Sequence, residues 1–296
     1  MARRSAAVIG LTAAGLALAS CSAGSASPAK TTRDSYGMPP QHILAAPKSM
    51  LAATGPQANG AMWALTGPDS AGLFEISSAT GQVKTSFPVS AFARSVAESR
   101  TGVIALALTT GQTGALQLVN ATTRKVTRVV RFPWPAVQVA VARGSSTFYV
   151  LTARAGVARV IIVAGQDGRV TGQVAVPSDV VAVVPGVRQA SLYAMERDGL
   201  LDQIAVRTGK LLTKIRAGSG GAESVTLSPD GRTVYVLEQL GGLANIALVD
   251  PAAQVVRRVL AAPGTCVQVL VSPGGGRLYE VVRGTRSGSI QITPAA

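Results

Sequence analysis

Two glutamates hold matching places in two similar stretches of the chain, and they are its best candidates for acid–base or metal chemistry. Glu196 follows "LYAM" and Glu238 follows "VYVL". If these stretches lie side by side, both carboxylates project from one face, where Asp179 and Glu223 would join them. Such a group could hold a divalent ion or act as an acid and base. The alternative is a set of solvated loop carboxylates that pair with nearby arginines.

Other residues suit ligand binding better than catalysis. Trp134 lies between two prolines in "RFPWPA", so its indole could be held rigidly for stacking on a sugar or peptide, or it could pack between structural units. Arg131 and Arg283 would lie on the same face as Trp134. The single histidine, His42, precedes the main part of the chain, which excludes a Ser–His–Asp triad or a histidine-rich zinc site there. We assign no catalytic residue, metal ligand or cofactor.

The first residues have the layout of an export signal. Arg3 and Arg4 precede an uncharged stretch from Ala6 to Ala19, which is shorter than the roughly 20 residues needed to span a bilayer. The segment from Leu18 to Cys21, "LASC", resembles the lipobox of bacterial lipoproteins. That resemblance implies cleavage before Cys21 and attachment of a diacylglyceryl group to its sulfur. Residues 1–20 are then a signal peptide, and we expect a protein anchored by lipid outside the cytoplasmic membrane.

Charge and composition narrow the choice of partner. The formal net charge is +14, with 47% hydrophobic and 14% charged residues, so the chain can fold and should be attracted to polyanions. Its lysines and arginines are scattered, and it lacks the motifs of nucleic-acid-binding proteins, so nucleic acid is not expected. Anionic lipid or an anionic envelope polymer is the better match. Once Cys21 is acylated, Cys266 has no partner for an internal disulfide.

Residues 21–49 are predicted to form a flexible tether. They are rich in Ser, Ala and Pro, and as a coil they would reach roughly 25 Å. Within them, "HILAA" is the one segment with strand character.

One turn recurs along residues 50–296. The copies "ATGQV", "TTRKV", "QDGRV", "RTGKL" and "PAAQV" end at intervals of 43, 44, 41 and 44 residues, and short apolar segments flank each copy. A period of about 40–50 residues with four short strands is typical of a β-propeller blade. We therefore predict an all-β propeller of six four-stranded blades, with seven as the alternative. The last blade lacks one strand, which "QHILAA" could supply to close the ring.

The segment "SPDGRTVYV", residues 228–236, resembles the hairpin between the first two strands of blades in YVTN and WD40-like propellers of bacterial surface proteins. A second copy, "SPGGGRLYEV", follows at residues 272–281. In such propellers ligands bind around the channel on one face, at the loops from second to third strand and from blade to blade. The residues predicted there as ligand-binding candidates are Arg131, Trp134, Asp179, Glu196, Glu223, Glu238 and Arg283.

Two functions follow as expectations. The first is a membrane-anchored, extracytoplasmic lipoprotein that acts as a non-catalytic binding or scaffold module for a protein or cell-envelope polymer. The alternative is a propeller hydrolase, similar to a lactonase, that uses loop carboxylates and arginines at the channel mouth. The sequence predicts no oligomeric state.

Overall fold

A computed structural model describes residues 42–46, 49–57, 59–67, 71–284 and 287–295. The chain divides into two compact units, residues 1–30 and 31–296, and every described residue belongs to the second. The predicted signal peptide, Cys21 and most of the predicted tether therefore lie outside the described residues. Among those residues no helix is long and apolar enough to cross a membrane.

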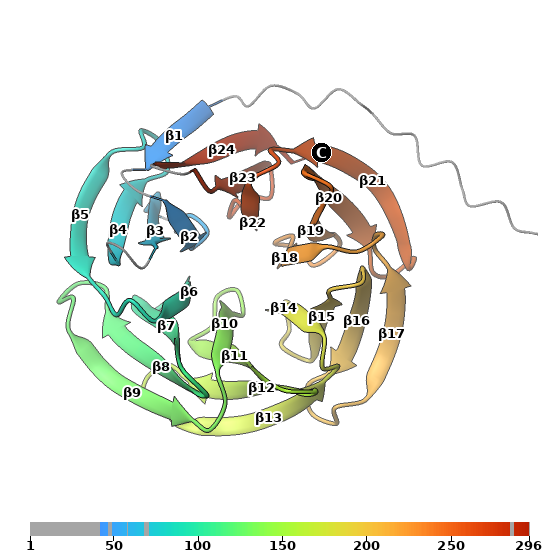
Figure 1. Ribbon diagram of the computed structural model, residues 1–296, viewed down its shortest axis with the longest axis horizontal. Coiled ribbons are helices and arrows are strands. Elements are labelled where there is room, and N and C mark those ends of the chain that lie inside the picture. The colour runs from blue at the N-terminus through green and yellow to red at the C-terminus, as the bar shows by residue number, and fades with distance from the viewer. Residues whose placement is uncertain (1–41, 47–48, 58, 68–70, 285–286, 296) are drawn as a thin grey trace, which may run out of the picture. The chain divides into compact units, whose positions relative to one another are not determined.

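The described strands form six antiparallel sheets of four strands, arranged as the blades of a ring (Figure 1). This confirms the predicted six-bladed β-propeller. Blades 1 and 2 contain β2 (Met50–Ala53), β3 (Ala61–Thr66), β4 (Gly72–Ser77) and β5 (Val83–Pro88), then β6 (Ala93–Glu98), β7 (Val103–Thr110), β8 (Thr113–Asn120) and β9 (Val126–Phe132). Blades 3 and 4 contain β10 (Ala136–Val141), β11 (Thr147–Arg154), β12 (Val157–Ala164) and β13 (Val170–Val176), then β14 (Val180–Pro185), β15 (Ser191–Glu196), β16 (Leu200–Ala205) and β17 (Leu211–Arg216). Blade 5 contains β18 (Ala222–Leu227), β19 (Val234–Leu240), β20 (Leu243–Asp250) and β21 (Val255–Ala262).

Blade 6 takes its strands from both ends of the chain. It combines β22 (Cys266–Val271), β23 (Arg277–Val282) and β24 (Gly288–Pro294) with β1 (His42–Ala46), which pairs antiparallel with β24 as the outermost strand. Leu44 of β1 is 1% exposed and packs in the cluster between blades 6 and 1, with Ile76 and Tyr279. The described part of the predicted closing segment, "HILAA", thus supplies the missing strand and closes the ring.

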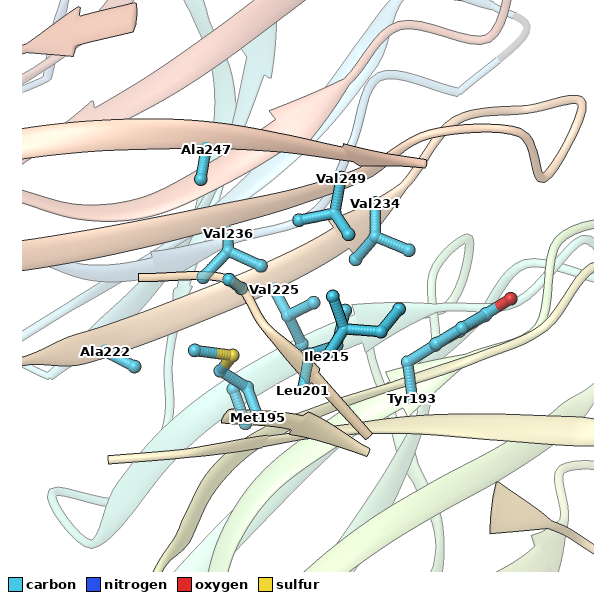
Figure 2. Close-up of a cluster of buried hydrophobic side chains, with 12 residues drawn as sticks. Tyr193, Met195, Leu201, Ile215, Ala222, Val225, Val234, Val236, Ala247 and Val249 are labelled. Carbon is cyan, nitrogen blue, oxygen red and sulfur yellow. The ribbon is translucent and has the colours of Figure 1, made fainter. Parts of the chain in front are cut away.

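The core lies between neighbouring blades, which explains why the strands are apolar on both faces. Each blade packs against two neighbours, so both of its faces are buried. Between blades 4 and 5, for example, Tyr193 and Met195 of β15 face Val234 and Val236 of β19 (Figure 2). The outermost strands have only one neighbour in the sheet and are more exposed, as in β5, although single residues such as Leu44 and Ile215 reach the core.

A bulge near the start of each innermost strand sets up links between blades. The residues that follow the six bulges are, in blade order, Ala52, Ser95, Gln138, Ala182, Ser224 and Gln268. The Gln138 side chain accepts a hydrogen bond of 2.6 Å from the backbone N–H of Val183 in the next blade, and Gln268 accepts one of 2.7 Å from Ala53. Ser95 and Ser224 make similar, longer bonds. The order Ala, Ser, Gln therefore occurs twice around the ring.

The ring has two faces with different connections. We call "turn face" the face that carries the segments joining first to second and third to fourth strands of each blade. We call "crossover face" the other face, with the segments joining second to third strands and each blade to the next. The first residue of β1, His42, pairs with Ile292 near the end of β24, so β1 begins at the turn face.

Candidate functional site

Glu196, at the end of β15 on the crossover face, is held by an internal ion pair. Its side chain is 8% exposed, and Lys214 Nζ lies 2.6 Å from Glu196 Oε1 and 3.3 Å from Asp202 Oδ1. The hydrogen bond with Glu196 raises the pKa of Lys214. Burial raises the pKa of Glu196, although the bond from Lys214 opposes that effect. This carboxyl group therefore already has a cation beside it, supplied by its own blade.

Two exposed aspartates lie next to Glu196. Carboxylate oxygens of Asp179, Glu196 and Asp198 all lie within 4.8 Å of one another. Asp198 is also approached by Arg216, whose Nη1 is 3.8 Å from Asp198 Oδ2. Three carboxylates are the donor set that a hard cation prefers, but the Lys214 ammonium and the Arg216 guanidinium already supply positive charge there.

Glu238 has the place in blade 5 that Glu196 has in blade 4, because each pairs with the first residue of its innermost strand. Its surroundings differ. Burial raises the pKa of Glu238, opposed by hydrogen bonds from the backbone of Gly220 and Ser219. A Cβ at Gly218 would collide with the carboxylate, so a glycine is needed where the loop crosses it. Glu238 is bound to this loop and is not part of the group formed by Asp179, Glu196 and Asp198.

The remaining predicted residues are dispersed. Trp134 is half-buried between blades 2 and 3, and the guanidinium carbon of Arg159 lies 4.8 Å from the centre of its ring. One indole face is therefore stacked on an internal cation. Arg283 donates a hydrogen bond of 3.4 Å to the Met50 carbonyl and so links blade 6 to blade 1. Arg131 and Glu223 are exposed.

The centre of the ring contains a cavity of about 430 Å³, walled by the innermost strands of all six blades. The segments that join first to second strands also line it, so it extends to the turn face rather than to the crossover face. The sequence-based expectation placed the ligand-binding residues on the crossover face. The Ser-Pro-Asp-Gly turn of residues 228–231, in contrast, contributes Ser228 and Pro229 to the cavity wall.

Glu98 is the one carboxyl group that lines this cavity among the described residues. It ends β6 at a place that Val141, Leu227 and Val271 occupy in other blades. Burial raises the pKa of Glu98 to about 7, a hydrogen bond with the Trp63 side chain opposes that shift, and the charge of Glu75 adds to it. Glu98 was not among the residues predicted from the sequence. The sequence does contain a signal for it: Glu98 is an acidic residue at a position that is apolar in most copies of the repeat.

Two arginines lie at the cavity's edge, on the segments that join first to second strands. Arg100 belongs to blade 2 and Arg143 to blade 3. The Arg143 guanidinium donates a hydrogen bond to the carbonyl of Pro273 in blade 6, on the opposite side of the ring (Figure 1). Arg143 thus spans the cavity where it meets the turn face.

No protein-family model and no curated protein matches the chain. Its fold and its own side chains are therefore the basis for inferring a function.

Proposed function

We propose that the protein is a membrane-anchored, extracytoplasmic lipoprotein that acts as a non-catalytic binding or scaffold module. The propeller would present its crossover face to a protein or to a cell-envelope polymer. The lipobox-like "LASC" ending at Cys21 supports the anchoring. The fold supports the binding role, because a ring of packed blades presents a fixed surface built from many loops.

The observation that carries the binding role is the state of the crossover-face carboxylates. Glu196 is paired with Lys214 at 2.6 Å, and Glu238 is bound by backbone groups. Groups held in this way have a fixed position, which suits recognition of a complementary surface. Around them, Arg197, Arg283, Asp179 and Asp198 are exposed and supply charges of both signs.

Capture from native membranes tests the binding role. We expect the tagged full-length protein to retain a specific protein or glycan, and the double substitution Asp179→Asn with Asp198→Asn to weaken that retention at least severalfold. Asp167→Asn is the matched control, because Asp167 is an exposed aspartate on the turn face. If nothing is enriched, or if the control weakens retention as much as the double variant, the proposal is wrong.

Substitution of the predicted lipid-bearing residue tests the anchoring. Cys21→Ser removes the sulfur that would be acylated, so we expect an unprocessed precursor or a protein released from the membrane. Membrane fractionation and the mass of the mature protein report the outcome. Normal processing together with full membrane retention would rule out acylation at Cys21.

The hydrolase alternative rests on the group of Asp179, Glu196 and Asp198, whose carboxylate oxygens lie within 4.8 Å of one another. If the group binds Ca²⁺ for catalysis, millimolar Ca²⁺ should raise Tm by several degrees by mass action, and Asp198→Asn should abolish both that rise and any lactone hydrolysis. A binding module whose acidic group is neutralised by Lys214 and Arg216 predicts no such rise.

A further inference from the structure

The described segments that join consecutive strands differ in charge between the two faces of the propeller. On the turn face they contain nine basic and two acidic residues, whereas on the crossover face they contain two of each. The nine basic residues are all exposed: Arg100, Arg124, Lys125, Arg143, Arg169, Arg188, Arg207, Lys210 and Arg232. The excess positive charge of the connecting segments is therefore concentrated on the turn face.

The two acidic residues in the described turn-face segments cannot offset nine basic ones, and both also bind the backbone of their own turns. Asp167 accepts a hydrogen bond from the N–H of Arg169, and Asp230 accepts one from the N–H of Arg232. Both stabilise turns, so their positions follow from local structure. Of the basic residues, Arg143 is bound to the Pro273 carbonyl and Arg232 lies near Asp230, whereas the pairs Arg124 with Lys125 and Arg207 with Lys210 are exposed on the turns.

Exposed apolar residues follow these turns at equivalent places. The first residues of the fourth strands in blades 1 to 5 are Val83, Val126, Val170, Leu211 and Val255, which are 42% to 49% exposed. In four of the five blades a basic residue is the immediate neighbour in the sequence: Lys84, Lys125, Arg169 and Lys210. Alternating cationic and apolar side chains at one edge are typical of surfaces that lie at a bilayer interface.

The chain that precedes the propeller joins it at the same face. β1 begins at the turn face, where His42 pairs with Ile292. Twenty residues, 22–41, separate His42 from Cys21, and a chain of that length spans at most roughly 70 Å. A lipid on Cys21 would therefore hold the turn face at high effective concentration near a bilayer.

We infer that the turn face is a docking surface for an anionic phospholipid bilayer. The basic residues of the turns bind lipid phosphates. The five exposed apolar residues that begin the fourth strands, which we call the apolar ring, contact the interface between headgroups and acyl chains. The crossover face then points away from the membrane, toward the partner of the binding module. This orientation rests on the proposed function, whereas the affinity of the turn face for anionic lipid does not.

The apolar ring favours a bilayer over a soluble anionic polymer. A polymer would gain from the basic residues alone, because it has no apolar interior to accept valine or leucine side chains. A bilayer gains from both kinds of side chain, at about 1 kcal/mol for each basic residue near an anionic surface.

Binding of the unlipidated protein to vesicles tests the inference. The protein would comprise residues 22–296, which include the whole second compact unit. We expect it to bind vesicles that contain phosphatidylglycerol, more weakly as salt increases, and not to bind phosphatidylcholine alone. The fourfold variant R124Q/K125Q/R207Q/K210Q should bind the anionic vesicles at least tenfold more weakly.

A matched variant removes the same net charge from the crossover side of the ring: R94Q/R131Q/R154Q/R197Q. All four of these arginines are exposed, and their loss should change binding by less than about twofold, because they lie away from the lipid. Equal losses in the two fourfold variants would show attraction by net charge alone and would overturn the inference. Tm values equal to that of the wild type confirm that both variants fold. If R124Q/K125Q/R207Q/K210Q does not fold, the double variant R124Q/K125Q takes its place.

The apolar ring has its own test. V126S/L211S should weaken vesicle binding severalfold and leave binding to soluble polyphosphate unchanged. If the wild-type protein binds polyphosphate but not anionic vesicles, the turn face is a polymer site and the inference is wrong. If the protein does not bind vesicles, the proposals that Cys21 is acylated and that the crossover face binds a partner still stand. If Cys21 is not acylated, the result of the vesicle experiment still stands.

Discussion

Glu98 and Glu196 both end a strand, but their surroundings give them different properties. Glu196 lies 2.6 Å from the ammonium of Lys214, so its charge is matched. Glu98 lies in the wall of the central cavity with a hydrogen bond from Trp63, no ion pair joins it to a described residue, and burial raises its pKa to about 7. The same residue type therefore belongs to an ion pair in one place and is a group that titrates near neutral pH in the other.

Glu98 should make the folded protein less stable as the pH rises. Its pKa is about 7 in the folded state and 4.5 in the reference state, so the native protein binds a proton that the unfolded chain releases. This stabilising contribution is full below pH 4.5 and is lost as the pH rises to about 7. Glu98→Gln keeps a neutral side chain at every pH, so we expect it to gain on the order of 1 kcal/mol over wild type at pH 8 and little at pH 4. Urea unfolding at the two pH values measures this, and an equal effect at both would contradict the assignment.

Lys214 should be needed to keep two buried carboxyl groups together. Lys214→Met leaves Glu196 and Asp202 side by side without a cation, and their side chains are only 8% and 2% exposed. We expect a loss of about 2 kcal/mol at pH 7, less than for a fully buried pair because the Lys214 side chain is partly exposed. The loss should shrink as the pH falls, because burial raises the pKa of Glu196 and a protonated Glu196 no longer needs a cation beside it. Lys210→Met, on an exposed turn of the same blade, is the control and should cost almost nothing.

At the scale of elements, β1 decides whether the ring is closed. It contributes a whole outer strand to blade 6 and buries Leu44 against blades 1 and 6. The links from Gln138 and Gln268 to the next blade act in the same direction on the inner side of the ring. Closure therefore depends on contacts between residues far apart in the sequence at both the outer and the inner strands.

Neighbouring residues of β1 allow a matched test of this closure. Leu44 is 1% exposed and Ile43 is 54% exposed. We expect Leu44→Ala to lower the free energy of unfolding by about 3 kcal/mol and Ile43→Ala by less than about 0.5 kcal/mol. Denaturant unfolding of the two variants measures the difference. Similar small losses would show that the ring is stable without the closing strand.

At the scale of the whole molecule, the ring is held by six clusters of buried side chains between blades, and Cys266 reports on one of them. It is 0% exposed in the cluster between blades 5 and 6, and burial raises its pKa to about 12. Its thiol should react with a thiol reagent only when the blades separate.

We expect Cys266 in the folded protein at pH 8 to react at least roughly a thousandfold more slowly than in urea, since both burial and the low thiolate fraction protect it. Leu44→Ala should raise the rate of the reaction by the factor that its loss in free energy of unfolding predicts, because opening at the closing strand frees blade 6. Fast labelling of the native protein, with no effect of Leu44→Ala, would mean that blade 6 opens by itself.

The sequence alone determined the fold, and it favoured six blades over seven; the structure has six. The recurring turn and the apolar segments around it repeat because every blade has the same burial on both faces, so the period survives in the residues themselves. The closing strand could also be predicted, since the last repeat lacks a strand and "QHILAA" is the available apolar segment.

Only the tertiary structure decided which groups meet. Lys214 and Asp202 were not predicted as partners of Glu196, because they come from different strands and their contact depends on strand register. Glu98 was missed for a similar reason: its pKa depends on burial against Trp63 of another blade. The charge difference between the two faces was hidden as well, because the sequence shows scattered lysines and arginines. Antiparallel strands place alternate connections at opposite ends of the ring, and that geometry gathers nine dispersed basic residues on one face.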